Sequence, residues 1–452
     1  MEMKGEREIG SDGDSSGKML PEDLVIGEVL TRLPAKPLMR FKCVSKLWWS
    51  TICRPSFCKA HRALSRSRPG CLLMVCSLDT NDPLAGVGFF SAAAIPLSSG
   101  GGVLEWRHLF SVGGGWAFGG VKTEGEGAAV VLDGSKYYSG VTEVINGHFC
   151  LYSGDQAAIC NISTREIMEL PRTPPPPPLA ANQQVHFSTY KYFLGFDSSH
   201  KEYKLLRVRT SSIATVENHQ RVIRTGSECV ILTLGGNKDD PAVAAAWRCL
   251  QCRTPPIDLS CGQSVYIDGA CYWWRCTGNR LTAFSFEEET FRQIYPPPTA
   301  ERLGVSLHQC GGYLAMATGL VDRRIKLWVL DKYVPESPPS ESVHAWTLHL
   351  ISIPYDFADL QYCLLGNLPT GEMLMAGAEQ EVIHGSKSPV SPFYSYNPTE
   401  KTLKRFVADN KFPSSITSIR NYINKFNKYY HKLCIYYHED DITPLDRLVS
   451  KT

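Results

Sequence analysis

From Cys71 onward the chain is a succession of short runs of β-forming residues, separated by glycine, proline, asparagine and aspartate. The clearest runs are Cys71 to Leu78, Gly147 to Tyr152, Tyr203 to Val208, Cys229 to Leu234, Val265 to Tyr272 and Lys326 to Leu330. Strand-length runs that are bounded by turn residues and lack helical periodicity are typical of an all-β domain. We therefore expect the larger part of this 452-residue chain to fold as β-sheet.

A weak internal repeat indicates how these strands are arranged. A turn that contains glycine leads into a hydrophobic strand at Asn146-Gly147, Asp268-Gly269, Gly311-Gly312 and Thr370-Gly371. The last glycines of successive turns are 122, 43 and 59 residues apart, so the first spacing is close to three times the second. This predicts a closed, β-propeller-like ring, with unrecognised copies of the repeated unit between Gly147 and Gly269.

Residues 20–61 follow a different pattern, which indicates short helices. Pro21 suits a first helical turn, and the apolar residues after it keep the spacing of one helix face. These apolar residues are Ile26, Val29, Leu30 and Leu33. Pro37 can begin a second helix, Ser45 can cap a third, and Pro55 should end it. Three helices in about forty residues have a marginal core, so the unit is either an interaction module or a cap on the rest of the chain.

The overall composition indicates a reduced, soluble, globular protein. The net charge of +2 creates no strong field, so neither nucleic acid nor a membrane surface is an expected partner. Residues 1–18 carry no apolar run of signal-peptide length, and no later stretch is long and apolar enough to span a bilayer. Sixteen cysteines spread over the chain without a secretory signal favour free thiols. We expect an intracellular protein, in the nucleus, the cytoplasm or both.

Three segments of the helical region resemble an F-box of the plant type. They are Leu20-Pro21-Glu22-Asp23-Leu24, Leu30-Thr31-Arg32-Leu33-Pro34, and Arg40-Phe41-Lys42-Cys43-Val44-Ser45-Lys46-Leu47-Trp48-Trp49-Ser50. The sequence departs from the family pattern at Pro37, where serine or threonine is common. It also departs at Gly27, which should cost the first helix about 0.5–1 kcal/mol relative to alanine.

Further along the chain, a series of short pieces is similar to an F-box-associated domain. The pieces are Asn146-Gly147 with Cys150-Leu151-Tyr152, Thr164-Arg165-Glu166, Leu194-Gly195-Phe196-Asp197, Ala246-Trp247-Arg248, Asp268-Gly269 with Tyr272-Trp273, Leu327-Trp328-Val329-Leu330 and Tyr396-Asn397-Pro398. Each piece is short, and the resemblance lies in their order. Asn161-Ile162 departs from the usual Asn-Pro of the family.

The resemblance implies an α+β multidomain chain. A small N-terminal three-helix F-box would precede a mainly antiparallel, all-β, β-propeller-like domain. We expect the following parts: a disordered leader at 1–18, the F-box at 19–62, a linker at 63–70, the F-box-associated domain at 71–438 and a tail at 439–452.

The resemblance also implies the substrate-recognition subunit of an SCF-type cullin–RING ubiquitin ligase. The F-box would bind a Skp-type adaptor, which bridges to the cullin and RING subunits, and the β domain would bind an unknown target protein. Carried over by position, the expected adaptor contacts are Leu20, Pro21, Leu24, Ile26, Leu33, Pro34, Val44, Trp48 and Ile52. Trp48 and Ile52 could equally belong to the core of the unit. No catalytic residue, cofactor or metal is expected in the chain itself.

Other functions stay open from the residues alone. Cys249 and Cys252 form a C-x-x-C pair, but no second close pair accompanies them, so buried cysteine is favoured over a zinc site. A propeller-like enzyme would need a convergent polar cluster on one face, and the common catalytic motifs are absent from the sequence. An interaction scaffold that uses an F-box outside a ligase has the same sequence features as a ligase subunit.

Overall fold

The computed structural model describes most of the chain in separate ranges. These are residues 25–66, 71–77, 87–96, 102–112, 140–176, 178–180, 183–217, 220–235, 246–250, 264–275, 280–297, 305–321, 324–330, 346–352, 361–367, 372–378, 392–397, 399–400, 402–408, 434–438 and 441–445. Among these residues, no helix is both long and apolar enough to cross a membrane.

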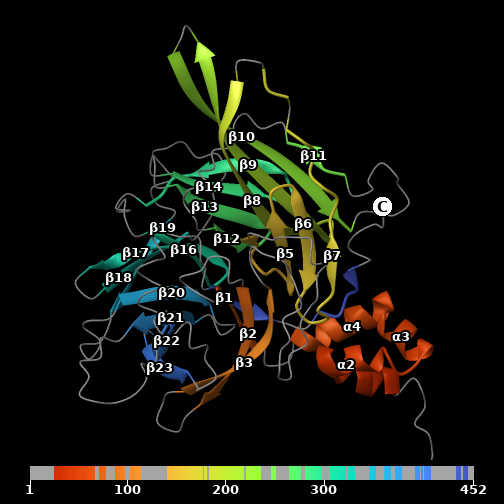
Figure 1. Ribbon diagram of the computed structural model, residues 1–452. Helices are drawn as coiled ribbons and strands as arrows, with labels where there is room; N and C mark the ends of the chain where they lie inside the picture. Colours follow the sequence, from red (N-terminus) through yellow and green to blue (C-terminus); the bar gives the residue numbers. More distant parts are fainter. Residues whose placement is uncertain are drawn as a thin grey trace, which may run out of the picture.

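Short helices at residues 25–66 form what we call the helical unit (Figure 1). Its elements are η1 (Val25–Val29), η2 (Leu30–Arg32), α2 (Ala35–Phe41), α3 (Lys46–Ile52) and α4 (Pro55–Arg66). Ser45 caps α3 as expected, because its Oγ accepts a hydrogen bond from the backbone N–H of Trp48 at 3.1 Å. The third helix ends at Ile52, before Pro55 as expected, but the sequence did not predict the further helix that follows. Pro55 is the first residue of α4, a position where its missing N–H costs no hydrogen bond.

The described strands form six four-stranded antiparallel units arranged as a ring, which is a β-propeller (Figure 1). The first sheet comprises β24 (Cys434–His438), β1 (Cys71–Ser77), β2 (Val87–Pro96) and β3 (Gly102–Val112). The second comprises β4 (Gly140–Val141), β5 (His148–Ser153), β6 (Gln156–Asn161) and β7 (Ile167–Glu169). The third comprises β8 (Gln183–Asp197), β9 (Glu202–Glu217), β10 (Gln220–Leu234) and β11 (Arg248–Cys249).

The remaining sheets follow in chain order. The fourth comprises β12 (Ser264–Ile267), β13 (Ala270–Arg275), β14 (Arg280–Ser285) and β15 (Thr290–Ile294). The fifth comprises β16 (Ser306–Cys310), β17 (Tyr313–Val321), β18 (Arg324–Leu330) and β19 (Trp346–Ser352). The sixth comprises β20 (Gln361–Asn367), β21 (Met373–Ala378), β22 (Pro392–Asn397) and β23 (Thr402–Ala408). The expected fold, short helices followed by a mainly antiparallel propeller, is confirmed.

The two ends of the propeller meet in one sheet. β24 pairs antiparallel with β1, so the last of the described strands completes the sheet that β1, β2 and β3 begin. β3 also pairs in parallel with β23 through residues 102–104 and 406–408, which joins the first and sixth sheets. Closing the ring in this way removes strand edges that an open sheet would expose.

Glycine turns recur where the sequence predicted them. Asn146-Gly147, Asp268-Gly269 and Gly311-Gly312 each lead into the second strand of a sheet, and all six residues have φ between 41° and 88°. Positive φ at both central residues is the feature of the type I′ turns that close tight hairpins. The fourth predicted turn, Thr370-Gly371, lies outside the described residues.

The long spacing between Gly147 and Gly269 has a different cause from the one predicted. A single sheet, the third, lies between the second and fourth sheets, where the spacing suggested two undetected copies. Its strands β8, β9 and β10 are 15, 16 and 15 residues long. Their far ends project beyond the ring at the top of Figure 1. Longer strands within one sheet, and not an additional sheet, account for the spacing.

The core lies between neighbouring sheets. Leu73 and Phe89 of the first sheet pack on Phe149 and Leu151 of the second, and the Phe89 and Phe149 ring centroids are 4.6 Å apart. Equivalent apolar clusters fill the spaces between the second and third, third and fourth, fourth and fifth, and fifth and sixth sheets. Because the sheets pack face to face, the interior strands are apolar on both faces.

A buried ion network also joins the third and fourth sheets. The Nζ of Lys204 lies 2.9 Å from Oδ2 of Asp197 and donates a hydrogen bond to the carbonyl of Phe286 at 2.8 Å. The same Nζ lies 3.1 Å from Glu289, which also pairs with Arg248 at 2.8 Å. Burial alone would raise the pKa of Asp197, but hydrogen bonds from the side chain of Lys204 and from the backbone and side chain of His200 lower the pKa to about 2.

Gly195 of β8 allows the third and fourth sheets to approach closely. A Cβ at this buried position would overlap the ring of Phe286, whose side chain is fully buried. Gly195→Ala is therefore expected to lower the free energy of unfolding by about 1–3 kcal/mol, as measured by urea denaturation. The matched control is Gly226→Ala on β10, where a Cβ meets nothing within 4 Å. An equal loss of stability in both variants would contradict the packing account.

Candidate functional site

The helical unit has a core that is completed from the far end of the chain. Leu30, Leu38 and Ile52 are almost fully buried and pack with Phe57 of α4. Ile442, near the C-terminus, belongs to the same cluster and is also fully buried. One side of the helical unit is therefore sealed by the chain's own residues.

The other side of the helical unit leaves large apolar side chains exposed. Val44 is 64% exposed, Leu47 50% and Trp49 56%, all within six residues at α3, and we call them the α3 surface. Figure 1 shows α3 on the side of the helical unit away from the propeller. Large apolar residues that are exposed together, and not scattered singly, mark protein interaction sites.

The chain segment that carries the α3 surface has charge of one sign. Residues 33–66 contain no aspartate or glutamate, and their basic residues are Lys36, Arg40, Lys42, Lys46, Arg54, Lys59, Arg62 and Arg66. Lys46 at the start of α3, Arg54 shortly after α3, and Arg40 near the end of α2 are exposed. The segment thus combines exposed apolar side chains with exposed basic ones, which would complement a partner with acidic groups beside an apolar groove.

The predicted adaptor contacts occupy different environments. Leu20, Pro21 and Leu24 lie outside the described residues. Pro34 is exposed just before α2, and Val44 belongs to the α3 surface. Ile26 and Leu33 are half-buried against the core of the helical unit.

Trp48 and Ile52 point toward the interior of the helical unit. Ile52 is fully buried, and the half-buried Trp48 ring packs edge-on against Phe41 at 5.1 Å. Leu47 and Trp49 of the α3 surface were not among the predicted contacts. The signal was present, because Trp48 and Ile52 keep the i, i+4 spacing of an inward face, which turns Trp49 outward.

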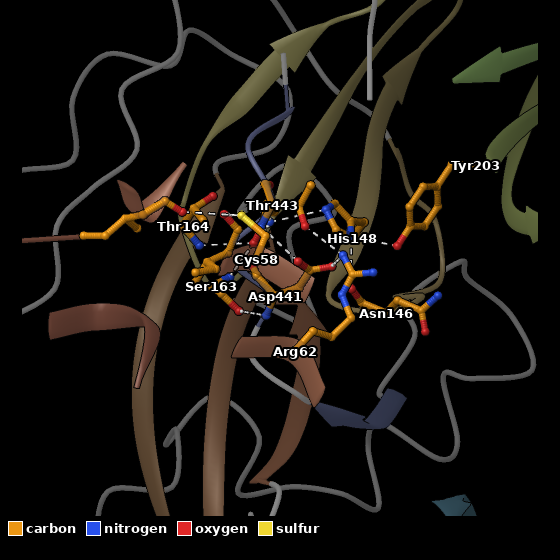
Figure 2. Close-up of polar contacts among 12 residues, drawn as sticks. Cys58, Arg62, Asn146, His148, Ser163, Thr164, Tyr203, Asp441 and Thr443 are labelled. Atoms are coloured by element: carbon orange, nitrogen blue, oxygen red, sulfur yellow. Dashed lines mark hydrogen bonds and ion pairs between the residues drawn. The ribbon is translucent and has the colours of Figure 1, made fainter. Parts of the chain in front are cut away.

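Residues 441–445 join the helical unit to the propeller, and we call them the C-terminal clasp. They belong to the segment that the sequence suggested as a tail. Asp441, Ile442 and Leu445 are each at most 3% exposed. Figure 2 shows how side chains from α4 and from the second sheet converge on the clasp.

The clasp binds α4 through a charged pair. Nη2 of Arg62 donates hydrogen bonds to Oδ2 of Asp441 at 2.6 Å and to Oγ1 of Thr443 at 2.7 Å. Burial alone would raise the pKa of Asp441, but the positive charge of Arg62 and the hydrogen bonds from Arg62 and the backbone N–H of Thr443 outweigh burial and lower it. The carboxylate therefore stays ionised opposite the guanidinium.

The clasp binds the turn between β6 and β7 on its other side. Nδ2 of Asn161 donates to the carbonyl of Asp441 at 2.9 Å, and Oγ of Ser163 accepts from the backbone N–H of Asp441 at 3.0 Å. Oε2 of Glu166 accepts from the backbone N–H of Leu445 at 3.1 Å. Asn161 also holds its own turn, because Oδ1 accepts from the backbone N–H of Ser163 at 2.8 Å.

His148 supports Asn161 from within the second sheet. Its Nε2 lies 3.3 Å from Nδ2 of Asn161, and its Nδ1 lies 2.9 Å from the carbonyl of Asn146 and 3.1 Å from the hydroxyl of Tyr203 (Figure 2). Because the amide Nδ2 can only donate, Nε2 accepts and Nδ1 carries the proton. Burial lowers the pKa of His148, so the ring is neutral.

Comparison with known proteins identifies the propeller. Residues 127–434 match the model of the F-box associated beta propeller domain. The chain belongs to this family. An F-box protein of Arabidopsis thaliana is 27% identical over 380 residues, which cover 80% of this chain and 81% of the relative. A putative F-box protein of the same plant is 26% identical over 402 residues, covering 85% and 89%.

These relatives confirm the resemblance to plant-type F-box proteins with an F-box-associated domain. The family match leaves out the helical unit, β1, β2 and β3, whereas the alignments to the F-box proteins cover at least four-fifths of the chain. The first sheet of this F-box-associated propeller therefore combines strands from before the matched range with β24, which begins where the range ends.

Proposed function

We propose that this chain is the substrate-recognition subunit of an SCF-type cullin–RING ubiquitin ligase. The helical unit binds a Skp-type adaptor, and the adaptor connects the chain to the cullin and RING subunits. The propeller binds a target protein, and the chemistry of ubiquitin transfer belongs to the partner enzymes, so this chain is not itself an enzyme. The proposal places the protein inside the cell, in the nucleus, the cytoplasm or both.

The observation that carries this proposal is the contrast between the two sides of the helical unit. Ile442 seals the inner side, whereas Val44, Leu47 and Trp49 remain half or more exposed on the outer side. A helical unit that served only as a cap would turn its largest apolar side chains toward the propeller. The exposed tryptophan is the residue type most enriched among energetically dominant interface contacts.

The basic residues around the α3 surface lead to a prediction about salt. Because Arg40, Lys46 and Arg54 are exposed, attraction to an acidic adaptor surface should accelerate encounter. The association rate constant, measured by stopped-flow fluorescence, is expected to fall about tenfold between roughly 0.05 and 0.5 M NaCl, with the dissociation rate little changed. A rate that does not respond to salt would show that the basic residues have no part in recognition.

Reconstitution tests the function itself. The full-length chain is mixed with a recombinant Skp-type adaptor, and complex formation is followed by size-exclusion chromatography. Cullin, RING subunit, ubiquitin and the activating and conjugating enzymes are then added together with proteins captured by the propeller. Adaptor binding with ubiquitin transfer to a captured protein supports the proposal. No adaptor binding, or binding without transfer to any captured protein, contradicts it, and the second result favours a scaffold outside a ligase.

A further inference from the structure

The C-terminal clasp contacts both the helical unit and the propeller. Toward the helical unit it places Ile442 in the apolar core and Asp441 against Arg62. Toward the propeller it bonds to Asn161, Ser163 and Glu166 through backbone groups, which fix the path of the segment. Apolar, charged and backbone contacts therefore act on the same five residues.

The contacts around the clasp restrict rotation of the helical unit relative to the propeller. Arg62 is about one-third exposed but donates to both Asp441 and Thr443 at 2.6 and 2.7 Å, a forked arrangement that fixes its direction. Lys42, the residue that follows α2, lies 3.9 Å from Glu166, which also accepts a hydrogen bond from the backbone N–H of Leu445. Two points of attachment, one on α4 and one just after α2, hold the helical unit in orientation as well as in position.

The clasp is also tied to the closure of the ring. It begins three residues after β24 ends at His438, and β24 pairs with β1 in the first sheet. Asn161, which binds the clasp, ends β6 in the second sheet. The helical unit is thus bound next to the first and second sheets, close to the strand that completes the ring.

We propose that the C-terminal clasp fixes the orientation of the helical unit on the propeller, with Arg62 and Asp441 as its positioning residues. The consequence of this inference rests on the proposed function. An adaptor bound to the α3 surface and a target bound to the propeller would be held at a fixed distance and in a fixed orientation. The α3 surface lies outside the clasp, so the clasp acts on geometry and leaves adaptor affinity unchanged.

Single-molecule energy transfer between two dyes tests the proposal. An azide-bearing amino acid replaces exposed Lys59 on α4 and exposed Gln293 on β15, and both are labelled in the full-length chain. The wild-type background should give one narrow distance distribution. Arg62→Met and Asp441→Asn should each broaden it and add a second population. The matched control, Arg172→Met, removes an arginine from a pair with Asp155 in which both side chains are at least half exposed, and it should leave the distribution narrow.

Hydrogen exchange supplies a second readout on the same variants. In the clasp variants, amides at 55–66 and 441–445 should lose protection about tenfold or more, whereas the β9 and β10 amides of the third sheet keep theirs. If Asp441→Asn fails to fold, Arg62→Met still decides the matter, because its side chain is partly exposed. Distance distributions and exchange identical to the wild type in Arg62→Met would overturn the proposal.

The measurement separates this inference from the proposed function. The distances are recorded for the free chain and again with the recombinant Skp-type adaptor bound. If the adaptor fails to bind, the ligase role is refuted. The distances measured in the free chain still test whether the clasp fixes the orientation of the helical unit. Normal adaptor binding in all variants, together with broadened distances in the clasp variants alone, is the expected result.

Discussion

Replacing Val44 and Trp49 together by aspartate is expected to weaken binding of a Skp-type adaptor at least about 100-fold. Both side chains are more than half exposed, so the change removes apolar contact area and adds charges that a partner groove would have to desolvate. The free energy of unfolding should change by no more than about 0.5 kcal/mol, since neither residue belongs to the core. Calorimetric titration measures the affinity, and thermal unfolding followed by circular dichroism measures the stability.

Two further variants give this prediction its controls. Leu348→Asp with Leu350→Asp makes the same chemical change at exposed positions of β19, and adaptor affinity should stay at the wild-type value. Ile52→Ala empties a fully buried position of the helical unit and should instead cost about 2–5 kcal/mol of stability. Adaptor affinity that survives in the folded Val44 and Trp49 variant would place the binding surface elsewhere.

Asp197→Ala is expected to destabilise the propeller by about 3–5 kcal/mol at pH 7, because it removes the more deeply buried of the two carboxylates that neutralise Lys204. Asp197 has no exposed side-chain surface, and Lys204, 2.9 Å away, is only 7% exposed. Oδ1 of Asp197 also accepts from the backbone N–H groups of Ser199 and His200, both at 3.0 Å, so the turn loses its anchor as well. Urea denaturation of both proteins measures the difference.

The stability that Asp197 contributes should depend on pH. Its pKa falls from 3.8 in the unfolded chain to about 2 in the folded protein, so the folded state favours the ionised form. The contribution is complete above the unfolded pKa and is lost as the pH falls through about 2. The difference in unfolding free energy between wild type and Asp197→Ala should therefore shrink as the pH falls below about 4.

Asp155→Ala is the matched control for this second prediction. Asp155 pairs with Arg172 at 3.4 Å, but both side chains are at least half exposed. Exposed pairs contribute about 0–1 kcal/mol, so this variant should stay close to the wild type at every pH. A similar loss of unfolding free energy in Asp155→Ala and Asp197→Ala would mean that burial of the Asp197 network does not contribute to stability.

The sequence predicted those parts of the fold that are determined by residues close together in the chain. The turns at Asn146-Gly147, Asp268-Gly269 and Gly311-Gly312 were visible because left-handed backbone selects glycine, asparagine and aspartate. The number of sheets could not be predicted from the spacing of the turns, because β8, β9 and β10 are unusually long and the sequence pattern does not determine the length of a strand. Pro55 shows a related limit, since proline both ends one helix and begins the next.

The candidate site was predictable only in part for a similar reason. The resemblance located the helical unit and Val44, but assigning Trp48 and Trp49 to opposite sides requires the helix register. The clasp could not be predicted from the sequence, because Arg62 and Asp441 are 379 residues apart and belong to segments with no shared pattern. Contacts at such separation follow from the closure of the ring, which the local sequence does not encode.

The closure of the ring by β24 has a consequence for synthesis on the ribosome. Strands β1, β2 and β3 are translated early, yet their sheet stays incomplete until β24 has been translated, more than 300 residues after β3, because β24 is its fourth strand. During that interval the nascent chain exposes an unpaired edge, which favours engagement by chaperones and makes premature termination costly. A nonsense codon anywhere before β24 would yield a polypeptide with an open first blade, and such products should be removed by proteolysis.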